Sequence, residues 1–366
     1  MDGVDIVCVL SRKKQDSLDI EAFLAHASNH PLINSAKVGC VCQATSASTV
    51  LIHKGTDLHA AAIHNVSPPP PSSLSCPAGC PASASTLATL DALLATPATL
   101  FQPLPPLAHL VDRMSIASLL SSLTPSIPSL SPPAPSPATL TLSPPSLVFP
   151  QPEADDDFPL VLKPRVASSC PLSHTLLWVR NKAVLPQAVA EWASSLLDLV
   201  PEGSSNVIQV VAERYIPHPS GVTHKVYVCG SSLTTTCKPS LGAKRVEDAE
   251  WLVFTAKSLK PPANAPGKGD GSDRVLAQTE VPAVREAGAS LARALAEETG
   301  LTVFGLDLLV DDKEGIHVVD INFFPSFSGS ATLYADLVDV VLNSAGLQAC
   351  DQGTTRESPS PSTAYE

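Results

Sequence analysis

Several short segments of the chain are rich in apolar and β-branched residues, a pattern that is typical of strands. The segments lie at residues 5–10, 48–53, 158–162, 206–211 and 225–228. The first leads into Ser11-Arg12-Lys13-Lys14, the second ends at His53-Lys54, and the third leads into Lys163. The pattern therefore predicts a sheet-rich chain in which several strands end at basic residues.

Residues 282–298 are rich in Ala, Leu and Arg, which favours an amphipathic helix. Pro282 stands where the first turn tolerates proline, and Gly300 stands just beyond the expected end. With the strands, this helix predicts a mixed α/β (α+β) chain.

Residues 304–310 and 316–322 read as two strands joined by a polar stretch of hairpin length at 311–315. With the turn centred near Lys313, Asp307 lies six residues before the centre and Asp320 seven after it. The two carboxylates are therefore expected nearly opposite each other, with Asn322 on the same strand face as Asp320.

Opposed carboxylates on neighbouring strands repel each other unless a cation or a proton relieves the repulsion. Asp307, Asp320 and Asn322 offer the oxygen ligands that Mg²⁺ prefers. The alternative is that both aspartates are ordinary surface residues, but apolar neighbours flank each of them and make an unpaired charge costly. The hairpin predicts a magnesium site.

The composition narrows the class of protein. The chain has 366 residues, of which 44% are hydrophobic, so it can bury a large core. It has no apolar run near the roughly 20 residues of a membrane span, and residues 6–10 are too short for a signal peptide. We therefore expect no membrane insertion and a cytoplasmic location, with the nucleus as a second compartment.

The charge argues against a nucleic-acid binder, and the cysteines argue against a structural zinc site. A net charge of −12 argues against a nucleic-acid partner, so any anion site must be local. Nine cysteines include the pairs Cys40/Cys42 and Cys76/Cys80, which lack a second pair at zinc-ligand spacing.

The chain has 36 prolines, many of them clustered in two Ser/Pro-rich segments, around residues 68–81 and over 124–152. Proline interrupts helical hydrogen bonding, so both segments are expected to be extended, solvated and without a direct part in the chemistry.

The motif Phe304-Gly305-Leu306-Asp307, followed by Val319-Asp320-Ile321-Asn322-Phe323-Phe324-Pro325, resembles the C-terminal signature of the inositol-tetrakisphosphate 1-kinases, also called inositol-trisphosphate 5/6-kinases. Further segments are similar to this family's motifs in the family's order, and they lie at residues 11–14, 52–57, 112–113, 158–164, 173–174, 224–230 and 238–241. The resemblance thus spans nearly the whole chain.

The resemblance implies an ATP-grasp fold in three parts. These are an N-terminal inositol-phosphate-binding α/β domain over 1–108, a central subdomain over 109–215 and a C-terminal subdomain with the metal site over 216–348. Residues 349–366 are expected to form a disordered tail. The implied activity is transfer of the ATP γ-phosphoryl group to a hydroxyl of an inositol tris- or tetrakisphosphate by a monomeric enzyme with ATP and two Mg²⁺ ions.

The resemblance also implies roles for individual residues. The catalytic residues are Lys163, His174 and Lys225, and the metal ligands are Asp307, Asp320 and Asn322. Substrate contacts are assigned to Lys13, Lys14, His53, Lys54, His174, Lys225 and Asn322, with Arg12 beside them. ATP contacts are assigned to Arg113, Lys163, Glu213, Tyr215, Ile216, Lys238 and Ser240, and Arg165 could face the same cleft as Lys163.

Two departures from the family pattern keep alternatives open. The loop at 167–174 lacks the family's glycine, which lets backbone N–H groups approach phosphate closely, and Ser326 stands where a glycine is usual. One alternative is a catalytically weakened homologue that binds inositol phosphates. Another is an ATP-grasp carboxylate ligase, which would share the hairpin and Lys163 but would not need the N-terminal basic residues.

Overall fold

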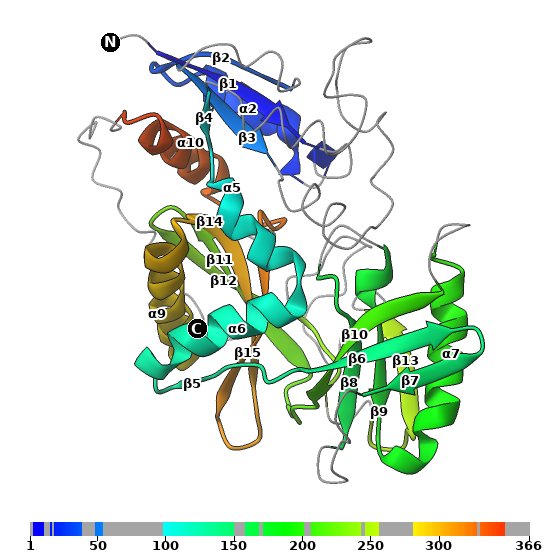
Figure 1. Cartoon of the computed structure of the whole chain (residues 1–366). Helices are drawn as coiled ribbons and strands as arrows, with labels where there is room; N and C mark the ends of the chain where they lie inside the picture. Colours follow the sequence, from blue (N-terminus) through cyan, green and yellow to red (C-terminus); the bar gives the residue numbers. More distant parts are fainter. Residues whose placement is uncertain are drawn as a thin grey trace, which may run out of the picture.

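The computed structural model describes residues 3–10, 15–16, 18–38, 48–53, 98–149, 158–167, 171–200, 206–242, 246–255, 281–327 and 330–347. The described residues form three sheets with helices packed on their faces (Figure 1). The predicted α/β class is confirmed.

The N-terminal sheet is parallel, in the order β2-β1-β3-β4. Its elements are β1 (Val4–Val9), α2 (Ile20–Ser28), β2 (Ile33–Val38), β3 (Thr49–His53) and β4 (Thr99–Leu100). Every residue of β3 is buried, as expected for a central strand of a parallel sheet. The strands predicted at 5–10 and 48–53 are confirmed.

The second sheet is antiparallel, in the order β13-β9-β8-β10-β6-β7. Its strands are β6 (Ser136–Leu142), β7 (Pro145–Val148), β8 (Leu160–Pro164), β9 (Thr175–Val179), β10 (Val207–Arg214) and β13 (Trp251–Thr255). Helix α7 (Leu185–Leu197) covers one face (Figure 1) and buries Trp192, whose Nε1 donates to the Thr175 carbonyl at 3.1 Å.

The prediction that residues 124–152 are solvated was wrong for β6. Ala138, Leu140 and Leu142 are at most 1% exposed, and β6 pairs with β10 along the six-stranded sheet. Apolar residues alternate with Thr139 and Thr141 at the period of a strand, and this signal outweighs the nearby prolines. The prolines are accommodated because Pro145 lies on the edge strand β7, where a missing N–H costs little.

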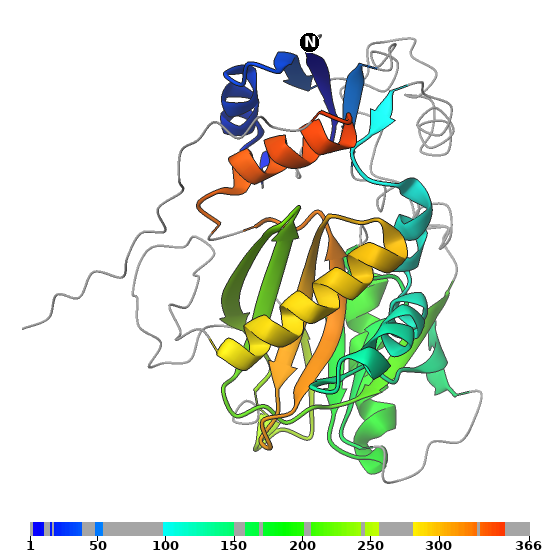
Figure 2. The ribbon, with the colours of Figure 1, turned by 90° about the vertical axis from the view of Figure 1, so that its left-hand side faces the viewer.

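The third sheet has the order β12-β11-β14-β15-β5. Its strands are β5 (Leu130–Ser131), β11 (Val222–Cys229), β12 (Ser232–Pro239), β14 (Val303–Val310) and β15 (Ile316–Phe323). Helix α9 (Pro282–Thr299) crosses one face (Figure 2), and a Cβ at Gly288 would lie 2.8 Å from Val226 Cγ2, so a glycine there allows the close approach. Gly300 ends α9 at φ 70°, as predicted.

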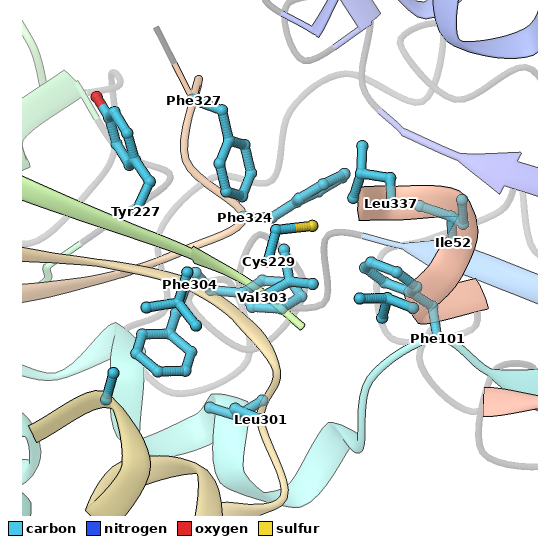
Figure 3. Close-up of a cluster of buried hydrophobic side chains, with 14 of the residues drawn as sticks. Ile52, Phe101, Tyr227, Cys229, Leu301, Val303, Phe304, Phe324, Phe327 and Leu337 are labelled. Atoms are coloured by element: carbon cyan, nitrogen blue, oxygen red, sulfur yellow. The ribbon is translucent and has the colours of Figure 1, made fainter. Parts of the chain in front are cut away.

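The remaining helices join these layers. They are α5 (Leu104–Leu107), α6 (Arg113–Leu123) and α10 (Leu333–Ser344), with 3-10 turns at Ala108–Val111, Thr124–Ser126, Pro171–His174 and Lys182–Val184. Helix α10 lies between the N-terminal and the five-stranded sheets and contacts α2 and β11 (Figure 2). Figure 3 shows part of the resulting core, a buried cluster that includes Ile52, Phe101, Leu337, Cys229 and Phe304.

The sheets do not follow the predicted boundaries at residues 109–215 and 216–348. Strand β5 pairs with β15 in the five-stranded sheet, and α6 contacts β15 and α9. Strand β13, although it follows β12 in the chain, pairs with β9 in the six-stranded sheet. The two larger sheets are thus built from interleaved segments, because the chain crosses between them more than once.

Candidate active site

Three charged residues stand side by side on adjacent strands of the five-stranded sheet. Lys225 on β11 is the cross-strand partner of Asp307 on β14, and Asp307 is the partner of Asp320 on β15. The predicted pairing of the two aspartates is therefore confirmed, and a cation lies next to them.

A β-bulge makes this pairing possible. Leu308 pairs with Val318 and Asp307 with Asp320, so Val319 is an extra residue of β15. The sequence count placed Asp320 one position farther from Lys313 than Asp307, and the bulge accounts for this difference. By absorbing Val319, the bulge keeps Asp320 opposite Asp307 while Val318 and Ile321 remain buried.

Lys225 and Asp307 form a close ion pair. The ammonium Nζ donates to Asp307 Oδ1 at 2.5 Å and to Oδ2 at 2.6 Å, and both side chains are about one-fifth exposed. Burial by itself lowers the pKa of Lys225, but the charge and hydrogen bonds of Asp307 outweigh it and hold that pKa above its ordinary value. Lys225 is therefore charged at neutral pH.

Asp320 has a different environment. Burial raises the pKa of this carboxyl, Arg113 opposes the rise, and neighbouring Asp307 adds to it. Lys163 and Lys225 also favour the charged form. Asp320 Oδ1 accepts a hydrogen bond from the Ile321 N–H at 2.9 Å. A further positive charge at this point would stabilise the ionised carboxylate.

The six-stranded sheet contributes Lys163 from β8. Its Nζ lies 2.5 Å from Glu213 Oε2 on the neighbouring strand β10, and each side chain is 14% exposed. Glu213, predicted as an ATP contact, is thus the ion-pair partner of a second predicted ATP contact.

The start of α6 positions Arg113. Asp112 caps the helix by accepting from the backbone N–H groups of Met114 at 2.8 Å and Ser115 at 3.2 Å. Arg113 Nη2 donates to the Ser173 carbonyl at 3.0 Å, which ties the helix to the turn that carries His174. Arg113 Nε is buried and has no hydrogen-bond partner among the described residues.

These elements surround one cavity of about 490 Å³ between the two larger sheets. Among the residues that line it are the predicted site residues Arg113, Lys163, His174, Lys225, Lys238, Asp307, Asp320 and Asn322. Leu176, Val319 and Phe324 form an apolar part of the cavity wall. The cavity therefore combines a cluster of cations with two carboxylates, an arrangement suited to a polyanionic ligand and a divalent cation.

The donor set fits magnesium. The described residues contain no cluster of three or more His, Cys, Asp and Glu side chains arranged to hold a metal. A cation here would therefore rely on Asp307, Asp320 and the Asn322 amide, completed by waters and ligand phosphates, as Mg²⁺ commonly does.

Several predicted residues lie away from the cavity. His53 is 1% exposed, with Nε2 3.0 Å from the Gln102 carbonyl, so the prediction that it grips a substrate was wrong: the end of β3 is inside the core. Arg165 Nε donates to Asp112 at 2.7 Å instead of facing the cleft with Lys163, because β8 ends at Pro164.

Three of the predicted ATP contacts, Tyr215, Ile216 and Ser240, also lie away from the cavity. The Tyr215 hydroxyl donates to the Leu241 carbonyl at 2.8 Å, and burial raises the pKa of Tyr215 to about 12. The Ile216 carbonyl lies 2.8 Å from His218 Nδ1, and the Ser240 N–H donates to the Gly221 carbonyl. None of the three side chains lines the cavity in the described part of the chain.

Other predictions fall outside the described residues. These are Arg12, Lys13, Lys14, Lys54, the altered loop at 168–170 and the tail at 349–366.

Tyr227 lines the cavity but was not predicted. It follows Lys225 by two positions on β11 and so shares its strand face, a signal that the alternation of the strand contained. Leu176 comes from β9, which pairs with β8 from a separate segment, and no local pattern marked it.

Residues 200–343 match the family described as the inositol 1,3,4-trisphosphate 5/6-kinase ATP-grasp domain. This range contains Glu213, Lys225, Lys238 and the whole hairpin that carries Asp307, Asp320 and Asn322.

Two similar curated proteins are named inositol-tetrakisphosphate 1-kinases. The chain is 28% identical over 210 residues to the inositol-tetrakisphosphate 1-kinase of Xenopus laevis, covering 55% of this chain and 46% of the relative. It is 26% identical over 188 residues to the inositol-tetrakisphosphate 1-kinase 2 of Glycine max, covering 51% and 53%. The aligned part thus spans about half the length of these relatives.

Among solved structures, the crystal structure of the D-cycloserine synthetase DcsG is similar at a TM-score of 0.52 and 12% identity, covering 94% of this chain and all of that one. At this identity the likeness concerns the fold.

No helix within the described residues combines the length and the apolar character needed to cross a membrane. Residues 200–343 are therefore similar to the ATP-grasp domain of the inositol 1,3,4-trisphosphate 5/6-kinases, and the fold of the chain agrees with an ATP-grasp architecture.

Proposed function

We propose that the chain is an ATP-dependent kinase that transfers the γ-phosphoryl group to a hydroxyl of inositol tris- or tetrakisphosphates. The observation that carries the proposal is the convergence of five basic side chains on Asp307, Asp320 and Asn322 in one cavity. The basic residues are Arg113, Lys163, His174, Lys225 and Lys238. Phosphoryl transfer needs this combination, because catalysis rests on positioning two anionic reactants and neutralising their charge.

The placement of the basic residues suggests a division of roles. Lys163 and Arg113 lie toward the six-stranded sheet and α6, and with Lys238 they would neutralise the nucleotide phosphates. Lys225 and His174 would meet the phosphates of the inositol ring, with Asn322 between the two reactants. Each contact would be a charge-assisted hydrogen bond, which is stronger than a neutral one.

In the reaction, the hydroxyl oxygen of the inositol forms a bond to the γ-phosphorus as the bond to the β,γ-bridging oxygen breaks. ADP leaves and the hydroxyl proton is released to solvent. Asp307, Asp320 and Asn322 would hold magnesium, which would supply positive charge to neutralise the nucleotide phosphates. The chain's own contribution is to hold the two reactants in line and to surround the developing charge with fixed cations.

The test is to incubate the purified full chain with Mg-ATP and a panel of inositol phosphates and to separate the products. We expect ADP and a more phosphorylated inositol in equal amounts. ADP formation only with amino or carboxylate substrates would instead support a ligase, and inositol phosphate binding without ATP consumption would support a weakened homologue.

The matched variants lie on the same hairpin. Asp320→Ala removes a cavity carboxylate, whereas Asp312→Ala removes an exposed carboxylate in the turn. We expect the first to lose at least about 100-fold in turnover and the second to keep it. Equal activity of the two variants would refute the role assigned to Asp320.

A further inference from the structure

The ion pair between Lys225 and Asp307 occupies a carboxylate that the proposed kinase needs for its divalent cation. Nζ donates to both Asp307 oxygens, at 2.5 and 2.6 Å, so both ligand atoms already face a positive charge. We propose that Lys225 is a positioning residue that holds Asp307 while the cation is absent and turns into the cavity when the cation binds. The inference rests on the proposed metal site and adds an order of events to it.

The two states compete for the same oxygens. A divalent cation coordinated by Asp307 would stand within a few ångströms of the Lys225 ammonium if the lysine stayed in place. Both side chains are only about one-fifth exposed, so water screens this repulsion poorly. The lysine therefore has to move as the cation arrives.

The cavity offers the lysine a place to go. Lys225 lines it already, and its flexible four-carbon stem allows the ammonium to swing without a change of backbone. An ammonium released into a partly buried site needs a new anionic partner. A phosphate of the acceptor would supply it, so cation binding prepares the cavity for the acceptor.

Asp320 is the carboxylate that Lys225 leaves available to a cation, because the lysine pairs with Asp307. It faces Asp307 across the hairpin, and Lys225 acts on it through its charge while donating hydrogen bonds to both oxygens of Asp307. A cation can therefore meet Asp320 first and then displace Lys225 from Asp307.

The experiment measures Mn²⁺ binding to the full chain by electron paramagnetic resonance, without nucleotide or inositol phosphate. Lys225→Met removes the competing charge, and we expect it to bind Mn²⁺ about tenfold tighter than the wild type. Lys225→Arg keeps the charge and should stay within about threefold of the wild type. Lys225→Gln, which keeps a donor, replaces the methionine variant if that one does not fold.

Lys163→Met is the matched control, because it removes the same charge from the same cavity while its ion-pair partner is Glu213. It should change the Mn²⁺ affinity less than Lys225→Met does.

The outcomes separate the two proposals. Tighter Mn²⁺ binding by Lys225→Met supports the inference, also where the wild type binds too weakly to measure. If the wild type binds Mn²⁺ and Lys225→Met binds it equally or more weakly, the inference is overturned. The proposed metal site is supported in that case. Failure of both proteins to bind Mn²⁺ overturns the metal site and the inference together. A purely structural ion pair would lower the melting temperature without tightening Mn²⁺ binding.

Discussion

Asp307 and Asp320 face each other across the β14–β15 hairpin, with Val319 taken up as a bulge beside them. The pairing places two partly buried carboxylates on the wall of one cavity. Lys225 relieves part of the repulsion between the two carboxylates by pairing with Asp307, and a bound divalent cation would relieve more of it. The arrangement therefore links the stability of the hairpin to its proposed ligand.

Asp320→Asn should separate stability from metal binding. Because burial disfavours the charge of Asp320, the neutral amide should raise the melting temperature of the metal-free protein by about 2 °C or more. The same variant should bind Mn²⁺ at least about tenfold more weakly, since one carboxylate ligand is lost. Thermal melts with and without Mn²⁺ check both effects, and a parallel loss of stability in both conditions would contradict the explanation.

Lys163→Ala should weaken the use of ATP. A charge-assisted hydrogen bond to a phosphate contributes about 1.5–3 kcal/mol, so kcat/KM for ATP should fall roughly 10- to 100-fold. Steady-state kinetics measure this, with Lys182→Ala as the control, because Lys182 is an exposed lysine in the 3-10 turn before α7. An unchanged kcat/KM would remove Lys163 from the nucleotide site.

Asp311→Ala should destabilise the hairpin at neutral pH. Asp311 accepts hydrogen bonds from the Lys313 N–H at 2.9 Å and from the Gly315 N–H at 2.7 Å. His317 Nε2 lies 2.8 Å from Asp311 Oδ2. Losing these bonds should lower the free energy of unfolding by about 1–2 kcal/mol. Urea unfolding at pH 7 measures the loss, with Asp312→Ala as the control.

The effect of Asp311 should also depend on pH with a definite sign. The hydrogen bond of His317, aided by those of Gly315 and Lys313, holds the pKa of Asp311 below its ordinary value. A carboxyl with a lowered folded-state pKa stabilises the protein above its unfolded-state pKa, and this stabilisation is lost as the pH falls through the folded-state value. The gap between wild type and Asp311→Ala should therefore narrow in strong acid, and a gap that widens there would contradict the assignment.

Gln102 should be a large stability determinant outside the cavity. Its Oε1 accepts from the Thr302 N–H at 2.6 Å and the Val303 N–H at 3.2 Å, and Nε2 donates to Thr302 Oγ1 at 2.8 Å. Gln102→Leu would leave two backbone donors unsatisfied, at about 1–3 kcal/mol each. Urea unfolding compares it with Gln187→Leu on the exposed face of α7, and equal losses would refute the prediction.

Much of the active-site hairpin could be predicted because it is local in the chain. Strand alternation, the polar turn and the spacing of Asp307 and Asp320 lie within a few residues of one another, so pairing follows from counting. The helix at 282–299 was equally readable from its composition and its terminal Pro and Gly.

Local patterns were a poorer guide where burial depends on distant segments. His53 follows an apolar strand and reads as a basic strand end, but packing against Gln102 and Phe323 encloses it. The segment at 124–152 reads as a proline-rich insertion, but β10 offers β6 a partner and a core to cover.

The strands, the carboxylate hairpin and the basic residues that a phosphorylated ligand requires can be read from the order of residues alone. Which of these residues meet depends on the packed fold, which pairs Lys225 with Asp307, Lys163 with Glu213, and Arg113 with Ser173. These partners are separated by 82, 50 and 60 residues, and their contact depends on how the two larger sheets and α6 pack together. Residue types and periods are local properties, whereas ion pairs are set by distances that exist only after the sheets have formed.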